Sequence, residues 1–119
     1  MRVQFVGNKE LAATLKKMER GTKNENLRKA MRAGAEIVLA DAKRRVPQKT
    51  GELRDSIQIQ ELQSARVDVG SPLVQAPVIE FGWPGHNIKP QPYMRPAFHE
   101  NRDQVLEAIE REMQGIMGL

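Results

Sequence analysis

Apolar residues recur at helical spacing in three segments of the chain. The clearest segment begins at a capping asparagine, Asn24 or Asn26, and ends before Pro47, because proline lacks an amide proton and disfavours helix in the residue before it. Its stripe has a period of three to four residues: Leu27, Met31, Ala35, Val38, Ala42 and Val46. The pattern predicts one long amphipathic helix. Several stripe residues are small and Gly34 sits beside Ala35, which indicates that a neighbouring element packs closely against this helix.

Two further amphipathic helices are predicted, one on each side in the sequence. The first is capped by Asn8, runs through about Arg20 and stops at Gly21, with Leu11, Leu15 and Met18 on one face. The last opens near Pro96, a residue tolerated in a first turn. Its apolar stripe consists of Phe98, Val105, Ile109, Met113 and Ile116.

Alternating patterns predict strands between the second and third helices. Ile57 and Ile59 alternate with polar residues, Val67 and Val69 do the same, and residues 63–65 form a short hairpin connection. A short apolar run at residues 3–6 predicts an opening strand. We therefore expect an α+β domain, a small antiparallel sheet packed with a long central helix and a C-terminal helix. A length of 119 residues suits a single domain over residues 1–119.

Residues 71–96 contain six of the seven prolines and also several large apolar side chains. A stretch so rich in proline cannot form one regular element. Its large side chains, however, are costly to leave in water: Val78, Ile79, Phe81, Trp83, Tyr93 and Met94. The segment is therefore predicted to be an ordered interaction loop.

The formal net charge of +4 is unevenly distributed. Residues 1–54 contain 14 Lys/Arg and 6 Asp/Glu, whereas residues 55–119 contain 5 and 9. Such asymmetry indicates an acidic partner for the first half, head-to-tail contact between copies, or two solvated faces that simply differ.

The residues available for catalysis are few. The chain has no cysteine, which excludes disulfides and thiol chemistry. His86 and His99 stand outside any recognisable metal-ligand spacing and are interpreted as surface histidines. Glu80 and Glu100 would act as a carboxylate pair only if the fold brings them together. We expect no enzyme, no cofactor and no metal.

The sequence has no apolar run near the roughly 20 residues of a membrane span and no secretory signal at the N-terminus. We therefore expect no membrane partner and a cytosolic protein.

A small basic DNA-binding or regulatory protein is the alternative function. Lys43, Arg44 and Arg45 cluster at the end of the long helix. Cations there also interact favourably with the helix dipole, and no aromatic residue is interleaved with them as a stacking platform. Non-specific contact with DNA phosphates stays open, while base-specific reading is not expected.

Two motifs in a fixed order resemble a known family. The first, residues 35–57, contains Ala42-Lys43, Val46-Pro47, Thr50-Gly51, Leu53-Arg54 and Ser56-Ile57. The second, residues 76–98, contains Glu80-Phe81-Gly82 and then Gln91-Pro92-Tyr93-Met94-Arg95-Pro96-Ala97. Together they resemble the tail-completion family of long-tailed phages and prophages, minor virion proteins also called head–tail joining or neck components. The resemblance covers residues 27–109; Gln75 and Trp83-Pro84 depart from the family pattern, so the shape of the loop at residues 83–89 does not carry over.

The motif residues have structural explanations. Pro47 stops the helix, Gly51 permits positive φ, Thr50 bonds the turned backbone, and Leu53 and Ile57 return the chain to the core as a strand. In the second motif, Gly82 permits a tight bend after Glu80. Pro92 and Pro96 keep the residues between them extended.

The resemblance implies an assembly protein at the joint between head connector and tail, located in the virion neck or tail and in the host cytoplasm during assembly. It implies a ring, sixfold in the family, with DNA passing through its middle. Expected partners are copies of the chain and the phage head-connector and tail proteins. The predicted protein interface comprises Arg44, Arg45, Phe81, Trp83, Tyr93 and Arg95. For Phe81 and Tyr93, packing in the core is the alternative.

Overall fold

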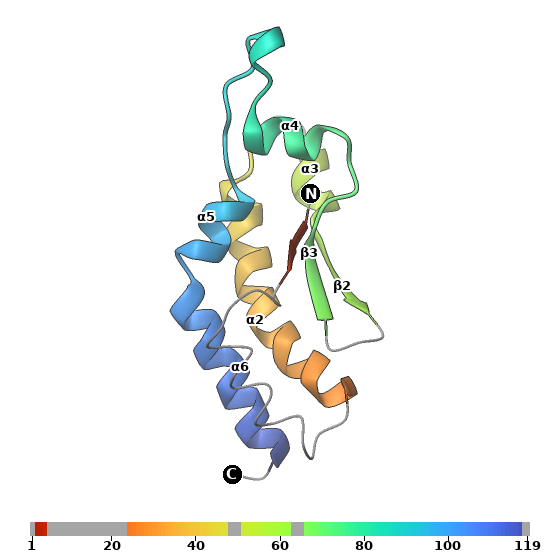
Figure 1. Ribbon diagram of the computed structural model, residues 1–119, viewed down its shortest axis with the longest axis vertical. Helices are drawn as coiled ribbons and strands as arrows, with labels where there is room; N and C mark the ends of the chain where they lie inside the picture. The colour runs from red at the N-terminus through yellow and green to blue at the C-terminus, as the bar shows by residue number, and fades with distance from the viewer. Residues whose placement is uncertain (1, 5–23, 48–50, 63–65, 118–119) are drawn as a thin grey trace.

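A computed structural model describes residues 2–4, 24–47, 51–62 and 66–117. The elements are β1 (Arg2–Gln4), α2 (Asn24–Arg45), α3 (Glu52–Ser56), β2 (Gln58–Leu62), β3 (Arg66–Gly70), α4 (Gln75–Phe81), the 3₁₀ turn η1 (Pro84–His86), α5 (Met94–His99) and α6 (Arg102–Met117). The α+β prediction is confirmed: a small antiparallel sheet packs with a long central helix and a C-terminal helix (Figure 1).

The sheet has the strand order β1-β3-β2, and both pairings are antiparallel. Val69 of the central strand β3 pairs with Val3 on one side and Ile59 on the other. The predicted strand pair is therefore confirmed, and the opening strand joins it. The hairpin connection at residues 63–65 and the helix predicted from Asn8 to Arg20 lie outside the described residues.

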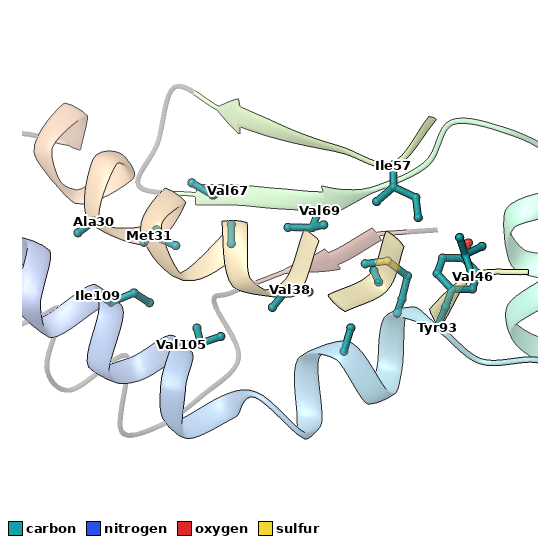
Figure 2. Packing of buried hydrophobic residues seen from close by; sticks show 14 of the residues in the cluster. Ala30, Met31, Val38, Val46, Ile57, Val67, Val69, Tyr93, Val105 and Ile109 are labelled. Carbon is teal, nitrogen blue, oxygen red and sulfur yellow. The ribbon is translucent and has the colours of Figure 1, made fainter. Parts of the chain in front are cut away.

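Helix α2 lies between the sheet and the C-terminal helices. Val67 and Val69 of β3 face one side of it, while Val105 and Ile109 of α6 face another (Figure 2). All six residues of the predicted stripe are at most 1% exposed: Leu27, Met31, Ala35, Val38, Ala42 and Val46. The helix ends at Arg45, two residues before Pro47, as the sequence predicts.

Gly34 explains how closely α2 and α6 approach. A Cβ atom at this position would lie 2.8 Å from Val105 Cγ1 and 3.0 Å from Ile109 Cγ1. Both of those side chains are buried. The absence of a side chain at Gly34 thus sets the separation of the two helices.

Three predicted boundaries were wrong. Leu53 lies in helix α3 and not in a strand, because Gly51 at φ 73° turns the chain and Asp55 N–H donates to Gly51 O at 2.9 Å; β2 begins only at Gln58. Within the Pro-rich stretch, residues 75–81 form helix α4, since Pro77 lies in its first turn, where no intrahelical amide bond is needed.

The third wrong boundary concerns the last helix, which is two helices. Helix α5 already begins at Met94 and ends at His99, and α6 begins at Arg102. Asn101 marks the junction: its side-chain Nδ2 donates to Ala97 O at 2.8 Å, while Val105 N–H donates to Asn101 O at 2.8 Å. The chain thus changes direction at a residue that hydrogen-bonds to both helices.

The two glycines inside long helices should respond to alanine in opposite ways. We expect Gly34→Ala to lower the free energy of unfolding by about 1–2 kcal/mol, because overpacking outweighs the gain in helix propensity. A Cβ atom at Gly115 meets nothing within 4 Å, so Gly115→Ala should raise it by roughly 0.5 kcal/mol. Urea unfolding followed by circular dichroism measures both; a stabilised Gly34→Ala variant would contradict the packing argument.

Candidate functional site

The buried carboxylate of Glu80 joins the two sequence motifs. Glu80 is 2% exposed at the end of α4, and it accepts hydrogen bonds from the backbone N–H groups of Tyr93 at 3.1 Å, Met94 at 2.7 Å and Arg95 at 3.4 Å. These are amides at the N-terminus of α5, which have no partner inside the helix. Glu80 therefore caps α5 across a separation of 13 to 15 residues.

Between these two anchors the chain forms a projecting arm, which we define as residues 82–92. It extends beyond the rest of the molecule at one end of the long axis (Figure 1). Trp83 and Ile88 pair as an antiparallel bridge, with Trp83 N–H donating to Ile88 O at 2.8 Å and Ile88 N–H to Trp83 O at 3.1 Å. At the base, Gln91 N–H donates to Ile79 O at 2.7 Å. The arm is thus an ordered hairpin, and its contact with another protein stays a prediction.

Gly82 is the bend at which the arm leaves α4. Its φ is 75°, a value that favours glycine, and a Cβ atom there would lie 2.8 Å from Ile88 O and Pro90 N. Pro92 lies exposed on the returning side of the arm. The prediction that the residues between Pro92 and Pro96 are extended was wrong, because α5 begins at Met94 and includes Pro96.

The predicted interface residues of this region separate into exposed and buried ones. Phe81 is 53% exposed and Trp83 48%. The exposed Arg95 lies over the Phe81 ring, with its guanidinium carbon 5.3 Å from the ring centroid, within cation–π range. The Trp83 ring contacts that of His86, with 3.7 Å between centroids. These side chains are available to a partner.

Tyr93, by contrast, is 1% exposed and belongs to the core, the alternative that the sequence left open. Its hydroxyl donates to Ala76 O at 3.3 Å. Burial, together with the nearby charge of Glu80, raises the pKa of Tyr93 to about 12. The side chain therefore stays neutral and fixes α5 against α4.

The two arginines at the end of α2 bind carboxylates of their own chain. Arg45 donates from Nε to Asp41 Oδ2 at 3.0 Å and also binds Glu100, while Arg44 binds Asp41. Asn101 Nδ2 donates to Asp41 Oδ2 at 2.7 Å. The Arg44 side chain is 76% exposed and that of Arg45 29%, so Arg44 is the more accessible to a partner.

The charges of this network shift two pKa values. Burial by itself raises the pKa of Asp41, but hydrogen bonds from Arg45, Asn101 and Arg44 outweigh it, so the pKa lies below 3.8. Hydrogen bonds to Asp41 and Glu100 raise the pKa of Arg45 above its ordinary value. Asp41 therefore links α2 to the junction of α5 and α6 as a charged group.

The remaining motif residues support the turn after α2. Pro47 is half-buried, Gly51 precedes α3, and Leu53 is 7% exposed in the core. Ser56 Oγ donates to Leu53 O at 2.6 Å and lies 2.6 Å from Ser71 Oγ. Thr50 lies outside the described residues.

The described residues contain no cluster of three or more His, Cys, Asp or Glu able to hold a metal ion. Glu80 and Glu100, the candidate carboxylate pair, have separate partners: backbone amides of α5 and Arg45 respectively. His86 and His99 are exposed, the former on the arm and the latter at the end of α5. Among the helices in the described part, none is long and apolar enough to cross a membrane.

Sequence reasoning missed the exposed residue Val74, which is 86% exposed at the start of α4. The signal was present: Val74, Pro77, Val78 and Phe81 follow the i, i+3, i+4, i+7 spacing of one helix face. The high proline content of this stretch obscured it.

Comparison with known proteins returned one family. A family model described as "Bacteriophage HK97-gp10, putative tail-component" matches residues 9–82. This range includes α2, the sheet strands β2 and β3, and α4 up to the first residue of the arm. Neither a curated protein nor a solved structure matches the chain.

Glu80→Gln should lower the free energy of unfolding by about 2 kcal/mol, because a charged acceptor of buried amides is replaced by a neutral one that also presents an NH₂ group. Urea unfolding followed by circular dichroism measures the loss, and the fluorescence of Trp83, the only tryptophan, reports on the arm. Glu107→Gln, on the exposed face of α6, is the control and should change stability by less than about 0.5 kcal/mol. Equal stability of the two variants would contradict the capping role.

Asp41→Asn should destabilise the fold by about 2 kcal/mol at pH 7, because the charged acceptor is lost. The folded-state pKa lies below the ordinary 3.8, so the wild-type advantage is fully present above that value and is lost as the pH falls through the folded pKa. Stability curves from pH 7 down to about 2 should therefore converge. Asp103→Asn, at an exposed position, provides the control. A constant gap at every pH would show that Asp41 acts through shape alone.

Proposed function

The chain belongs to the HK97-gp10-like family of phage tail components, and from that premise we propose that it completes the joint between the head connector and the tail of a long-tailed phage or prophage. It acts by binding protein subunits, as a structural component of the virion. Residues 1–119 act as one domain, assembled in the host cytoplasm. Six copies of the chain associate into a ring, and DNA passes through the ring.

The observation that supports this function best is the arm. Eleven residues leave the body at Gly82 and return before Tyr93, and Trp83 is half exposed on a backbone fixed by the bridge to Ile88. An ordered apolar projection is costly in water and loses little conformational freedom on binding. Such a feature suits a protein that docks onto a preformed surface.

Charge supports contact with neighbouring subunits as well. Arg95 and Lys89 are the charged residues of the segment 82–95, which has no Asp or Glu. At the end of α2, Arg44 is mostly exposed. The proposed contacts are therefore the arm with Phe81 and Arg95 at its base, and Arg44 at the helix end. Arg45 contributes indirectly, because it holds Asp41 and Glu100.

The basic end of helix α2 gives only weak support to the alternative function, a DNA-binding or regulatory protein. Both arginines bind Asp41, which partly neutralises the charge that a phosphate backbone would meet. Non-specific contact of the ring with DNA remains part of the proposal.

Deleting the gene for this chain from the phage or prophage should stop assembly at one step. We expect DNA-filled heads and finished tails to accumulate separately, as seen by electron microscopy after induction, because neither half-particle depends on the joint. A copy supplied in trans should restore complete virions. Complete virions without the chain, or a loss of heads or of tails, would contradict the proposed position.

The same complementation assay tests the arm. Trp83→Ala should fail to restore joined particles while leaving the unfolding midpoint unchanged, since the side chain is half exposed. Gln104→Ala, at an exposed position on α6, is the control and should restore them. Full rescue by Trp83→Ala would show that the Trp83 side chain of the arm is not needed for joining heads to tails.

A further inference from the structure

The outer face of helix α4 is an apolar stripe without a charged residue. Val74 and Phe81 are 86% and 53% exposed, Pro77 is exposed and Val78 half-buried. Their i, i+3, i+4, i+7 spacing places all four on one face, opposite the buried Ala76 and Glu80. A solvent-facing helix surface is normally polar, so this contiguous face, here called the α4 stripe, is a surface to be covered.

The Phe81 end of the α4 stripe is cationic. Arg95 lies over the Phe81 ring at 5.3 Å, and the segment from Gly82 to Arg95 contains Lys89 but no Asp or Glu. A partner surface that meets this end is therefore favoured if it is anionic.

Helix α3, which carries two exposed carboxylates, lies near the Val74 end of the α4 stripe. Helix α3 lies beside the turn that leads into α4, since Ser56 Oγ and Ser71 Oγ are 2.6 Å apart and Leu73 N–H donates to Ser71 Oγ at 3.2 Å. Glu52 and Asp55 on α3 are exposed; the Asp55 side chain is 71% exposed and pairs with Arg54 at 3.1 Å. The α4 stripe thus has a cationic end and an end near helix α3, where two acidic side chains outnumber the single arginine, Arg54.

We propose that a second copy of this chain covers the α4 stripe, antiparallel to it and related by a two-fold axis. Phe81 then packs against Val74 of the second copy, and Arg95 faces Asp55 of the second copy. A two-fold axis makes each of these contacts twice, so the α4 stripe of each copy covers that of the other. The pair is a form of the free chain and does not depend on the head–tail joint.

The size of the α4 stripe sets the expected strength. Seven residues of helix span roughly 10 Å, so the buried area lies well below the approximately 1,000 Å² of a stable interface. The pair is therefore weak and reversible, with a Kd on the order of 0.1–1 mM. A weak pair covers the apolar face in free subunits and yields it readily to another protein.

Cysteine cross-linking tests the geometry, because the natural chain has no cysteine. Val74→Cys and Phe81→Cys proteins, mixed near 1 mM and oxidised, should form the mixed dimer at least about tenfold more than either homodimer, since antiparallel packing places position 74 opposite position 81. Trp83→Cys is the matched control: Trp83 is 48% exposed, close to the value for Phe81, yet lies on the arm. It should give no excess with Val74→Cys.

Charge exchange is the second test, read by sedimentation equilibrium. Arg95→Asp and Asp55→Arg should each weaken self-association by about fivefold, and the double variant should recover to within about twofold of the natural chain. Trp83→Ser should leave self-association unchanged. Each variant is made at an exposed position, and circular dichroism checks its fold.

Four results would overturn the proposal. One is a chain that stays monomeric up to about 2 mM, since a Kd on the order of 1 mM would then leave dimer visible. The others are equal cross-linking with Trp83→Cys, a ladder of multimers from the Val74→Cys/Phe81→Cys double variant, and additive losses in the charge exchange. A ladder would show that the α4 stripe makes a head-to-tail contact between copies. A strict monomer would show that a different protein covers the stripe. Neither result bears on the particle assembly phenotype, which tests the proposed function separately.

Discussion

Burial of α2 on more than one side is the constraint on which the other elements depend. The helix has too wide an apolar surface for one neighbour, so β3 covers one side and α6 another, and Gly34 lets α6 approach until Val105 and Ile109 fill the space. With both sides occupied, the sheet and the C-terminal helices never need a large contact with each other. The core is therefore centred on one helix, and the small three-stranded sheet suffices.

Two buried carboxylates attach the arm and helix α5 to that core. Glu80 holds the start of α5 by three backbone amides, which closes the base of the arm, and Asp41 holds the junction of α5 and α6 through Asn101 and Arg45. Each carboxylate joins segments distant in sequence, and Glu80 also accepts from backbone amides of α5 that have no partner inside the helix. The arm can therefore project into solvent while both of its ends stay fixed. A rigid projection of this kind suits assembly, because a flexible loop would lose conformational entropy when it is ordered on binding.

Family membership and physical explanation agree on the same motifs. The residues that resemble the tail-completion pattern are those that end α2, begin α3, cap α5 and bend the chain at Gly82. They define the shape of the subunit. Trp83, which departs from the pattern, lies on the arm and is half exposed.

The long helix, the strand pair and the α+β class follow from the sequence alone, because periodicity and proline stops are local signals. The sequence did not determine the helix at Gln75–Phe81, since prolines that end helices elsewhere are harmless in a first turn. Nor did it decide whether Phe81 or Tyr93 is exposed, because both are aromatic residues in one apolar stretch. Only the tertiary structure placed Tyr93 in the core and Phe81 in solvent, and only it gave Glu80 its role as a cap. The reason is that capping and burial join residues 13 or more positions apart, and no local pattern encodes such a distance.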